Sequence, residues 1–134
     1  MIVIAVGGGG IPVIEDEHHN VTGAEAVIDK DPASALLASH LKVDLFLIST
    51  DTEYVYLDFK KPTQRSLKRV TSCVMQQYLN EGHFPPGSMG PKVESAIRFL
   101  ATGGTEVIIA CPDMLLDAID GRSGTHIVPD TTDR

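Results

Sequence analysis

The sequence has no apolar run of transmembrane length, only two cysteines and no excess of positive charge. A membrane-spanning helix needs about 20 apolar residues, and a signal peptide needs a basic start, so we expect no membrane partner. Cys73 and Cys111 form no C-x-x-C pair, which favours a reduced, cytoplasmic setting. Eleven Lys and Arg against 18 Asp and Glu give a net charge of −7, which argues against nucleic acid as a partner.

The remaining composition is that of an ordinary globular protein. Of the 134 residues, 43% are hydrophobic and 22% are charged. This length is enough for one domain with its own core and too short for two. We therefore expect a single domain over residues 1–129, followed by a polar tail over residues 130–134.

Short aliphatic runs alternate with segments of helical periodicity. The patterns predict strands over residues 2–6, 44–49, 54–57, 106–110 and 124–128. They predict helices over residues 33–41, 71–81, 91–102 and 113–120, the first with Leu36, Leu37 and Leu41 facing inward. Such alternation implies parallel pairing with right-handed crossovers. The fold class predicted is α/β, a three-layer αβα sandwich with a mainly parallel sheet.

The stretch from Gly87 to Lys92 leads directly into one of these helices. Its two glycines allow close approach of a ligand to the backbone, and Pro91 suits a first helical turn. A helix start with free N–H groups and a lysine in its first turn favours an anion such as phosphate. The alternative is a surface lysine on an ordinary capped helix, and spacing alone leaves both open.

Two other strand-to-helix boundaries carry polar groups. Asp29, Lys30 and Asp31 precede the helix over residues 33–41, where the acids either belong to a site or simply complement the helix dipole. Thr50 and Asp51 follow a buried strand, and open α/β sheets bind ligands just past the carboxyl ends of their strands.

A run of four glycines follows the first predicted strand: Gly7, Gly8, Gly9 and Gly10. The run is not a P-loop, since no Gly-Lys-Ser/Thr follows, and it is a poor dinucleotide fingerprint because the next residues are extended. Either the backbone N–H groups of the run contact a small anion, or the run is a flexible turn; the sequence leaves both interpretations open. The polar residues from Glu15 to Asn20 predict a solvated hairpin tip.

Taken together, these motifs resemble the carbamate kinases of the amino acid kinase family, over their C-terminal half. The matching segments occur in the family's order and cover nearly the whole chain. They are Gly7–Val13, Glu25–Asp31, Thr50–Asp51, Phe59–Gln64, Gly87–Val93 and Gly121–Thr125. Each motif is weak alone, whereas the combination is specific.

The resemblance implies phosphoryl transfer between ATP and carbamate, giving ADP and carbamoyl phosphate, within arginine metabolism. Lys92 would stabilise charge on the transferred phosphoryl group, Asp31 would orient the lysines, and Lys30 would lie close to the phosphates. Mg²⁺ would be held mainly by the phosphates, without a protein metal site. The nucleotide would be bordered by Thr50, Asp51, Met89, Gly90 and Lys92, and the small substrate by Gly7, Gly8, Gly9 and Gly10.

The family's N-terminal half, with its Gly-Gly-Asn phosphate loop, has no counterpart in this sequence. We therefore expect activity to need such a half, supplied by another chain, and the resemblance also implies a homodimer. One alternative is a noncatalytic nucleotide-binding or assembly domain. Another is an amino acid kinase with a carboxylate acceptor, although the central Lys30 of Asp29-Lys30-Asp31 favours the carbamate branch.

Overall fold

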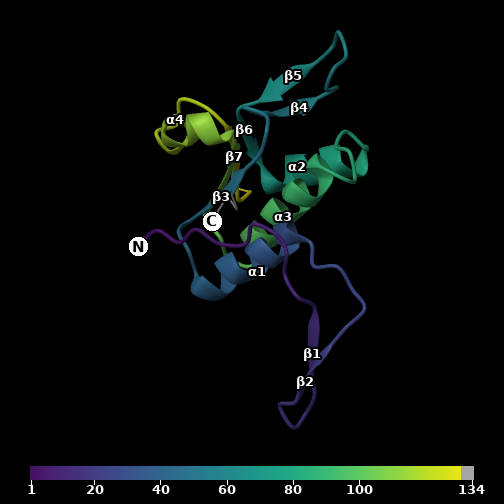
Figure 1. Cartoon of the computed structure of the whole chain (residues 1–134). Helices are drawn as coiled ribbons and strands as arrows, with labels where there is room; N and C mark the ends of the chain where they lie inside the picture. The colour runs from purple at the N-terminus through teal and green to yellow at the C-terminus, as the bar shows by residue number, and fades with distance from the viewer. Residues whose placement is uncertain (131–134) are drawn as a thin grey trace.

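The structure is a computed structural model and describes residues 1–130. Figure 1 shows four α-helices and eight strands in the described residues, with β3 to β6 consecutive between α1 and α2. The helices are α1 (Lys30–Leu41), α2 (Ser72–Asn80), α3 (Met89–Ala101) and α4 (Leu115–Ile119), the last preceded by the 3₁₀ turn η1 (Pro112–Met114). The strands are β1 (Val13–Glu15), β2 (Val21–Gly23), β3 (Leu45–Ser49), β4 (Val55–Leu57), β5 (Arg65–Leu67), β6 (Arg69–Thr71), β7 (Glu106–Ala110) and β8 (Thr125–Val128).

Within residues 1–130 the main sheet has four strands in the order β3-β7-β8-β6. The outer pairs, β3 with β7 and β6 with β8, are parallel, while β7 and β8 run antiparallel. The sheet is therefore mixed, with two of its three pairings parallel as expected. Because β3 and β7 are parallel, both end at the same edge of the sheet, where Thr50 N–H donates to the carbonyl of Ala110 at 2.9 Å.

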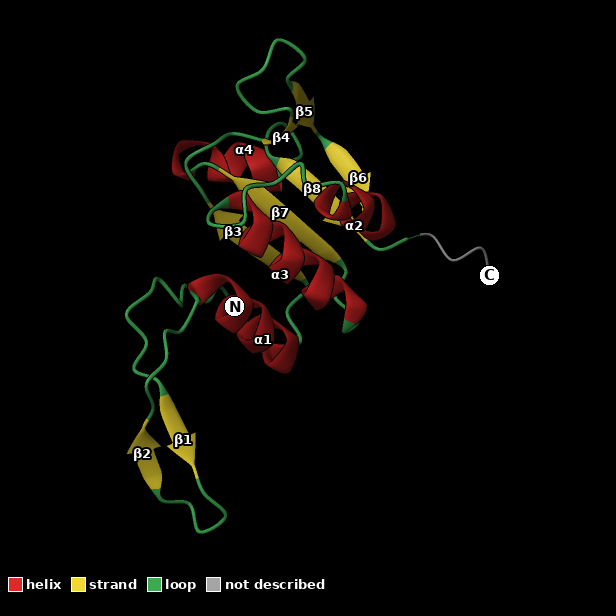
Figure 2. Cartoon of the chain, turned by 90° about the vertical axis from the view of Figure 1, so that its right-hand side faces the viewer, coloured by secondary structure: helices red, strands yellow, loops and turns green. Residues whose placement is uncertain are grey.

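Helices cover both faces of this sheet (Figure 2). Along β7, Val107 and Ile109 pack into the main core with residues of α1, α2 and α3. The alternate residues Ile108 and Ala110 instead pack against Ala118 of α4. Since successive strand side chains point to opposite faces, β7 is buried on both sides. This confirms the predicted α/β sandwich.

Helix α1 buries a narrower face than its sequence suggested. Ala35 and Ala38 are buried, whereas Leu36 and Leu41 are 59% and 48% exposed. The prediction that the leucines face inward was therefore wrong for Leu36 and Leu41, while Leu37 is half-buried. Alanine at these positions lets α1 lie close against α3, and the leucines fall on other faces of the helix.

Two strand predictions need correction. The segment Ile2–Val6 is not a strand in this structure, because none of its backbone groups pairs with another strand. The strand at 54–57 exists as β4, but it pairs antiparallel with β5 in a separate hairpin outside the main sheet. Strands β5 and β6 were not predicted, since each is three residues long and begins with an exposed arginine in a polar stretch.

The remaining helices and strands lie close to their predicted positions. α2 begins after the N-cap Thr71, α3 begins two residues earlier than predicted, and β7 covers the predicted residues. The tip between β1 and β2 is exposed, as predicted, and Asp16 accepts from the backbone of His18 and Asn20. No helix within residues 1–130 is long and apolar enough to cross a membrane.

At the C-terminal end, Asp130 is part of the folded structure. Its carboxylate accepts from the hydroxyl of Ser72 at 2.6 Å and from the backbone N–H of Cys73 at 3.1 Å, so it caps the start of α2. The rest of the predicted tail, residues 131–134, lies outside the described residues.

Candidate active site

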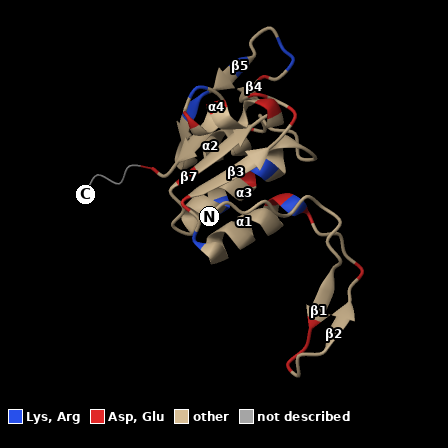
Figure 3. Cartoon of the chain, turned by 60° about the vertical axis from the view of Figure 1, so that its left-hand side comes forward, with Lys and Arg blue, Asp and Glu red and all other residues tan. Residues whose placement is uncertain are grey.

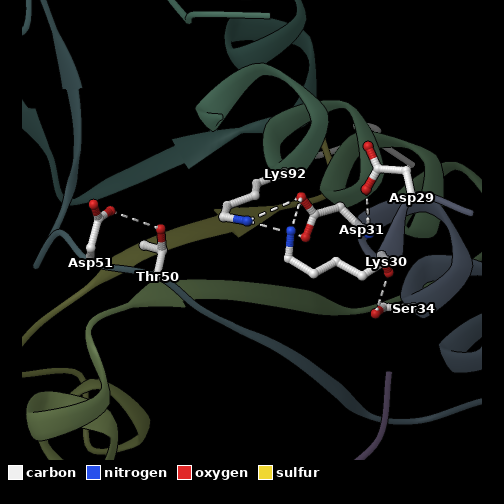
Figure 4. A network of polar contacts seen from close by, with 7 residues as sticks. All are labelled: Asp29, Lys30, Asp31, Ser34, Thr50, Asp51 and Lys92. Atoms are coloured by element: carbon white, nitrogen blue, oxygen red, sulfur yellow. Dashed lines mark hydrogen bonds and ion pairs between the residues drawn. The ribbon is translucent and has the colours of Figure 1, made fainter. Parts of the chain in front are cut away.

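The starts of α1 and α3 meet through an ion pair between Lys92 and Asp31. The Lys92 amine donates to both carboxylate oxygens of Asp31, at 3.2 and 3.0 Å (Figure 4). The two side chains are only 10% and 8% exposed. The pair joins residues 61 positions apart in the sequence. Removing one member of such a buried pair leaves an uncompensated charge, so the pair also fixes the two helix starts relative to one another.

Lys30 brings a second positive charge to the same carboxylate. Its amine lies 3.8 Å from Oδ2 of Asp31, and its side chain is 47% exposed. Figure 4 shows both lysine amines directed at Asp31. One carboxylate between two ammonium groups leaves a net charge of about +1, with one of the amines open to solvent. Such a cluster favours an anion, which the half-exposed Lys30 can reach.

The local sequence explains why Asp31 points toward α3. Asp29 is the N-cap of α1, and its carboxylate accepts from the backbone N–H of Asp31 at 2.9 Å. The capping bond is thus made by Asp29, which leaves the Asp31 side chain to pair with Lys92. The two acids of the Asp29-Lys30-Asp31 motif have different tasks in the structure.

The start of α3 is built around Gly90. Its N–H donates to the Pro85 carbonyl at 2.9 Å, and a Cβ at Gly90 would lie 2.9 Å from that same oxygen. Glycine is therefore required by close packing of the chain on itself. Because the Gly90 N–H is used and Pro91 has none, this helix start offers fewer free N–H groups than the sequence suggested. Favourable charge for an anion at this helix start therefore comes mainly from the lysines.

Thr50 and Asp51 lie at the carboxyl edge of the sheet, immediately after β3. The Thr50 hydroxyl donates to Asp51 at 3.3 Å, and within residues 1–130 neither side chain bonds to the Lys92–Asp31 pair. The hydroxyl of Thr52 is buried without a hydrogen-bond partner in the described residues. Sequence reasoning missed Thr52, since nothing in its neighbours marks it as buried.

An aromatic surface on β4 and the loop after it was also missed. The rings of Tyr56 and Phe59 stack with centroids 5.7 Å apart, and the Lys60 amine lies 5.4 Å from the Phe59 centroid. Burial, with the nearby Glu53 carboxylate, raises the pKa of Tyr56. Flat, partly exposed rings of this kind can stack on a planar ligand.

The glycine run is not brought to the lysines in this structure. Gly7, Gly8, Gly9 and Gly10 lie in an exposed segment, and a Cβ on any of the first three would meet nothing within 4 Å. Gly10 approaches only Ile28. Of the residues singled out from the sequence, Lys92, Asp31 and Lys30 therefore converge, Met89 and Gly90 begin the helix that carries Lys92, and the glycines stay apart.

A cavity of about 220 Å³ lies beside the ion pair, between α1 and α3. Its walls include the acids Asp29 and Glu94, and the side chain of Arg98 pairs with Glu94 at 3.5 Å. Neither lysine of the cluster lines it. The cavity and the open side of Lys30 are therefore separate features of this region.

A sequence model of the amino acid kinase family matches residues 2–111 of the chain. The chain belongs to the amino acid kinase family. Among curated members, it is 47% identical to the carbamate kinase-like protein YahI of Escherichia coli and 48% identical to the carbamate kinase of Thermococcus kodakarensis. Each match covers 95% of this chain and 40% of the relative, so the chain spans about two fifths of the length of these relatives.

Solved structures of the family agree with the fold. The carbamate kinase of Giardia lamblia bound to AMP-PNP superposes with a TM-score of 0.86 and 39% identity. The superposition covers 91% of this chain and 38% of that protein. The similarity to carbamate kinases inferred from the motifs is thus confirmed by both comparisons.

Proposed function

We propose that this chain is the nucleotide-binding part of a carbamate kinase-like phosphotransferase, which exchanges a phosphoryl group between ATP and carbamate. The observation that carries the proposal is the convergence of Lys92 and Lys30 on Asp31 at the starts of two helices. The similarity of the chain to proteins named carbamate kinase, one of them bound to AMP-PNP, supports the choice of reaction.

The proposed chemistry needs positioning and positive charge more than covalent help. In phosphoryl transfer, negative charge spreads over the oxygens of the transferred group while the attacking and leaving oxygens stay in line. Lys92, held by Asp31, would neutralise that charge without reorganising during the reaction. Lys30 would contact the phosphates from the solvent side. Asp31 itself would keep both amines oriented.

The nucleotide fits this cluster because its phosphates supply the anion that the surplus positive charge favours. Thr50, Asp51, Met89 and Gly90 would border the nucleoside, at the edge where β3 ends and α3 begins. Mg²⁺ would be bound by the phosphates and water, which it commonly retains as ligands. When bound, it would neutralise further charge on the phosphates.

The complete activity is proposed to involve more than this chain. The chain spans about 40% of the curated relatives, and we propose that residues equivalent to the rest of them complete the carbamate site. They would come from another chain, or from a homodimer of a longer protein, in the cytoplasm. The reaction would take part in arginine metabolism, with Gly7–Gly10 on the small-substrate side.

Calorimetric titration of MgADP into the chain tests the nucleotide part of the proposal. We expect saturable binding, and Lys92→Met should weaken it by roughly tenfold or more, since a hydrogen bond to a charged group contributes about 1.5–3 kcal/mol. Lys68→Met is the matched control, because Lys68 is exposed and has no contact with the Asp31 cluster.

Equal affinities of the wild type and Lys92→Met for MgADP would contradict the proposal. Equal losses of MgADP affinity in Lys92→Met and Lys68→Met would also contradict it, since they would indicate only a general effect of net charge. Adding the N-terminal half of a carbamate kinase as a separate chain then tests catalysis. Binding without phosphoryl transfer in that mixture would favour the noncatalytic nucleotide-binding alternative.

A further inference from the structure

The cavity of about 220 Å³ near the ion pair lies between two neighbouring helices, α1 and α3 (Figure 2). Six residues line it: Asp29 and Pro32 at the start of α1, and Pro91, Glu94, Ser95 and Arg98 of α3. The four residues from α3 recur at intervals of three and four positions, so they share one face of that helix. This face is polar although it lies beside another helix.

Ser95 is the buried residue of this lining. It is only 2% exposed, and its hydroxyl makes no hydrogen bond within residues 1–130. The serines of α1 differ, because Ser34 donates to the carbonyl of Lys30 at 2.6 Å and Ser39 donates to that of Ala35 at 2.8 Å. Serine inside a helix often bonds to a preceding carbonyl in this way. A buried hydroxyl without a partner is costly, so the Ser95 hydroxyl indicates a bound group in the cavity.

Two carboxylates provide further acceptors in the same cavity. Acidic residues occur beside basic ones at the start of α1 (Figure 3). There Asp29 uses Oδ1 to accept from the Asp31 N–H, while its Oδ2 makes no hydrogen bond or ion pair in the described part of the chain. Glu94 pairs with Arg98 at 3.5 Å, between side chains that are both largely exposed. An exposed ion pair of this kind is weak, so the Glu94 carboxylate can turn to a ligand.

Three oxygen acceptors match the three donors of a primary ammonium group. Such a group donates three hydrogen bonds and accepts none, and its bonds to carboxylates are strengthened by charge. Asp29, Glu94 and Arg98 together carry a net charge of about −1, which favours a monovalent cation. The rings of Pro32 and Pro91 can contact a short carbon chain. The cavity is smaller than the roughly 300–1,000 Å³ of sites for drug-sized ligands, so the ligand is small.

Other classes of ligand fit this lining less well. A phosphate would face two carboxylates. Mg²⁺ and Ca²⁺ take six or more oxygen ligands, and no group of three or more His, Cys, Asp or Glu among residues 1–130 could hold a metal ion. The amines of Lys92 and Lys30 are directed at Asp31 and do not line the cavity, so they leave it accessible to a cation.

We propose that the cavity between α1 and α3 binds the ammonium group of a small primary amine. The ammonium group donates to the Ser95 hydroxyl and to the carboxylates of Asp29 and Glu94, while the carbon chain contacts the prolines. This site is distinct from the cluster of Lys92 and Lys30, and it needs no nucleotide. The proposal therefore goes beyond the proposed function, and either can fail while the other holds.

Titration of the whole chain with ethylammonium chloride at constant ionic strength tests the proposal, with the amide NMR shifts of residues 92–98 as the readout. We expect saturable shifts. Tetramethylammonium has the same charge but no N–H donor, and it should give none. Ser95→Ala should weaken ethylammonium binding roughly tenfold, because it removes a hydrogen bond to a charged group. Ser34→Ala is the matched control, since Ser34 bonds to a carbonyl of its own helix and does not line the cavity.

Asp29→Asn tests the charge separately from the fold. Asparagine is as good an N-cap as aspartate, so α1 should persist while ethylammonium binding weakens by roughly tenfold or more. The amide shifts of β7 report whether the fold survives in each variant.

Three results would overturn the proposal. An absence of saturable shifts in the wild type would show that water alone fills the cavity. Equal shifts with tetramethylammonium would show a general effect of charge. Unchanged affinity for ethylammonium in Ser95→Ala or Asp29→Asn, with the fold intact, would show that the amine binds elsewhere.

Discussion

Two glycine-rich segments of this chain look alike in sequence and differ completely in the structure. At Gly90 the backbone packs so closely against Pro85 that a Cβ would lie 2.9 Å from its carbonyl oxygen. At Gly7 a Cβ would meet nothing within 4 Å. The first segment leads to a buried lysine paired with Asp31, and the second is exposed and contacts almost nothing.

Glycine content therefore does not by itself build a site. Gly90 lies in the first turn of α3, whose Val93, Ala96 and Leu100 are buried in the core, and this packing fixes the helix start. Gly10 is followed by the β1–β2 hairpin, whose strand residues are exposed. In this chain the ordered glycine is the one that belongs to a packed helix.

The ion pair should carry the largest effect on stability. Asp31→Ala leaves the buried Lys92 amine without its carboxylate, and we expect a loss of about 3–5 kcal/mol in the free energy of unfolding. Urea unfolding of the wild type and of Asp31→Ala measures this loss of stability. Asp51→Ala removes an exposed carboxylate nearby and should stay within about 0.5 kcal/mol of the wild type. If the two variants were equally stable, the pair would not hold the helix starts together.

Alanine substitutions at Gly90 and Gly7 should differ in their effect on stability, by less than the loss of the ion pair. Gly90→Ala forces a Cβ against a backbone oxygen, so we expect destabilisation of about 1–3 kcal/mol. Gly7→Ala meets open space and should change the free energy of unfolding by less than about 0.5 kcal/mol. Thermal unfolding of the two variants measures the contrast. A tolerated alanine at Gly90 would mean that close packing is not the reason for glycine there.

The smallest effect on stability is expected at the start of α2, which is capped by the carboxylate of Asp130. The hydroxyl of Ser72 donates to Asp130 and, with a further hydrogen bond from Thr71, lowers the pKa of Asp130 below its usual 3.8. A carboxyl with a lowered pKa in the folded state stabilises the fold above its ordinary pKa, and this contribution is lost as pH falls through the lowered value.

The thermal stability of Asp130→Asn should therefore lie slightly below that of the wild type at neutral pH. The difference should shrink as the pH falls below about 4. Melting curves at a series of pH values measure it. A difference that stays constant down to pH 2 would indicate that the charge of Asp130 has no part in capping α2.

The sequence predicted best where local signals and packing agree. The limits of β7 follow from an aliphatic run, and the position of α3 follows from helical periodicity. The α1 leucines were misplaced because helical spacing shows which residues share a face, but not which face a neighbouring helix covers. The three-residue strands β5 and β6 have too few residues for any periodicity.

The site was predictable in part. A resemblance to a family suggested that Lys92, Lys30 and Asp31 act together, and the structure brings their side chains into contact. Spacing alone left each of them with an ordinary alternative. The use of the Gly90 N–H by Pro85 and the unpaired hydroxyl of Thr52 depend on contacts between segments, which no local pattern contains.

Calorimetric titrations of MgADP and of adenosine into the wild type and Lys92→Met test whether the lysine cluster binds phosphates. If the lysine cluster binds the phosphates, the wild type prefers MgADP over adenosine by a wide margin, and Lys92→Met loses much of that preference while its affinity for adenosine is unchanged. The same preference for MgADP in both proteins would contradict phosphate binding by Lys92, because the phosphates would then be bound elsewhere.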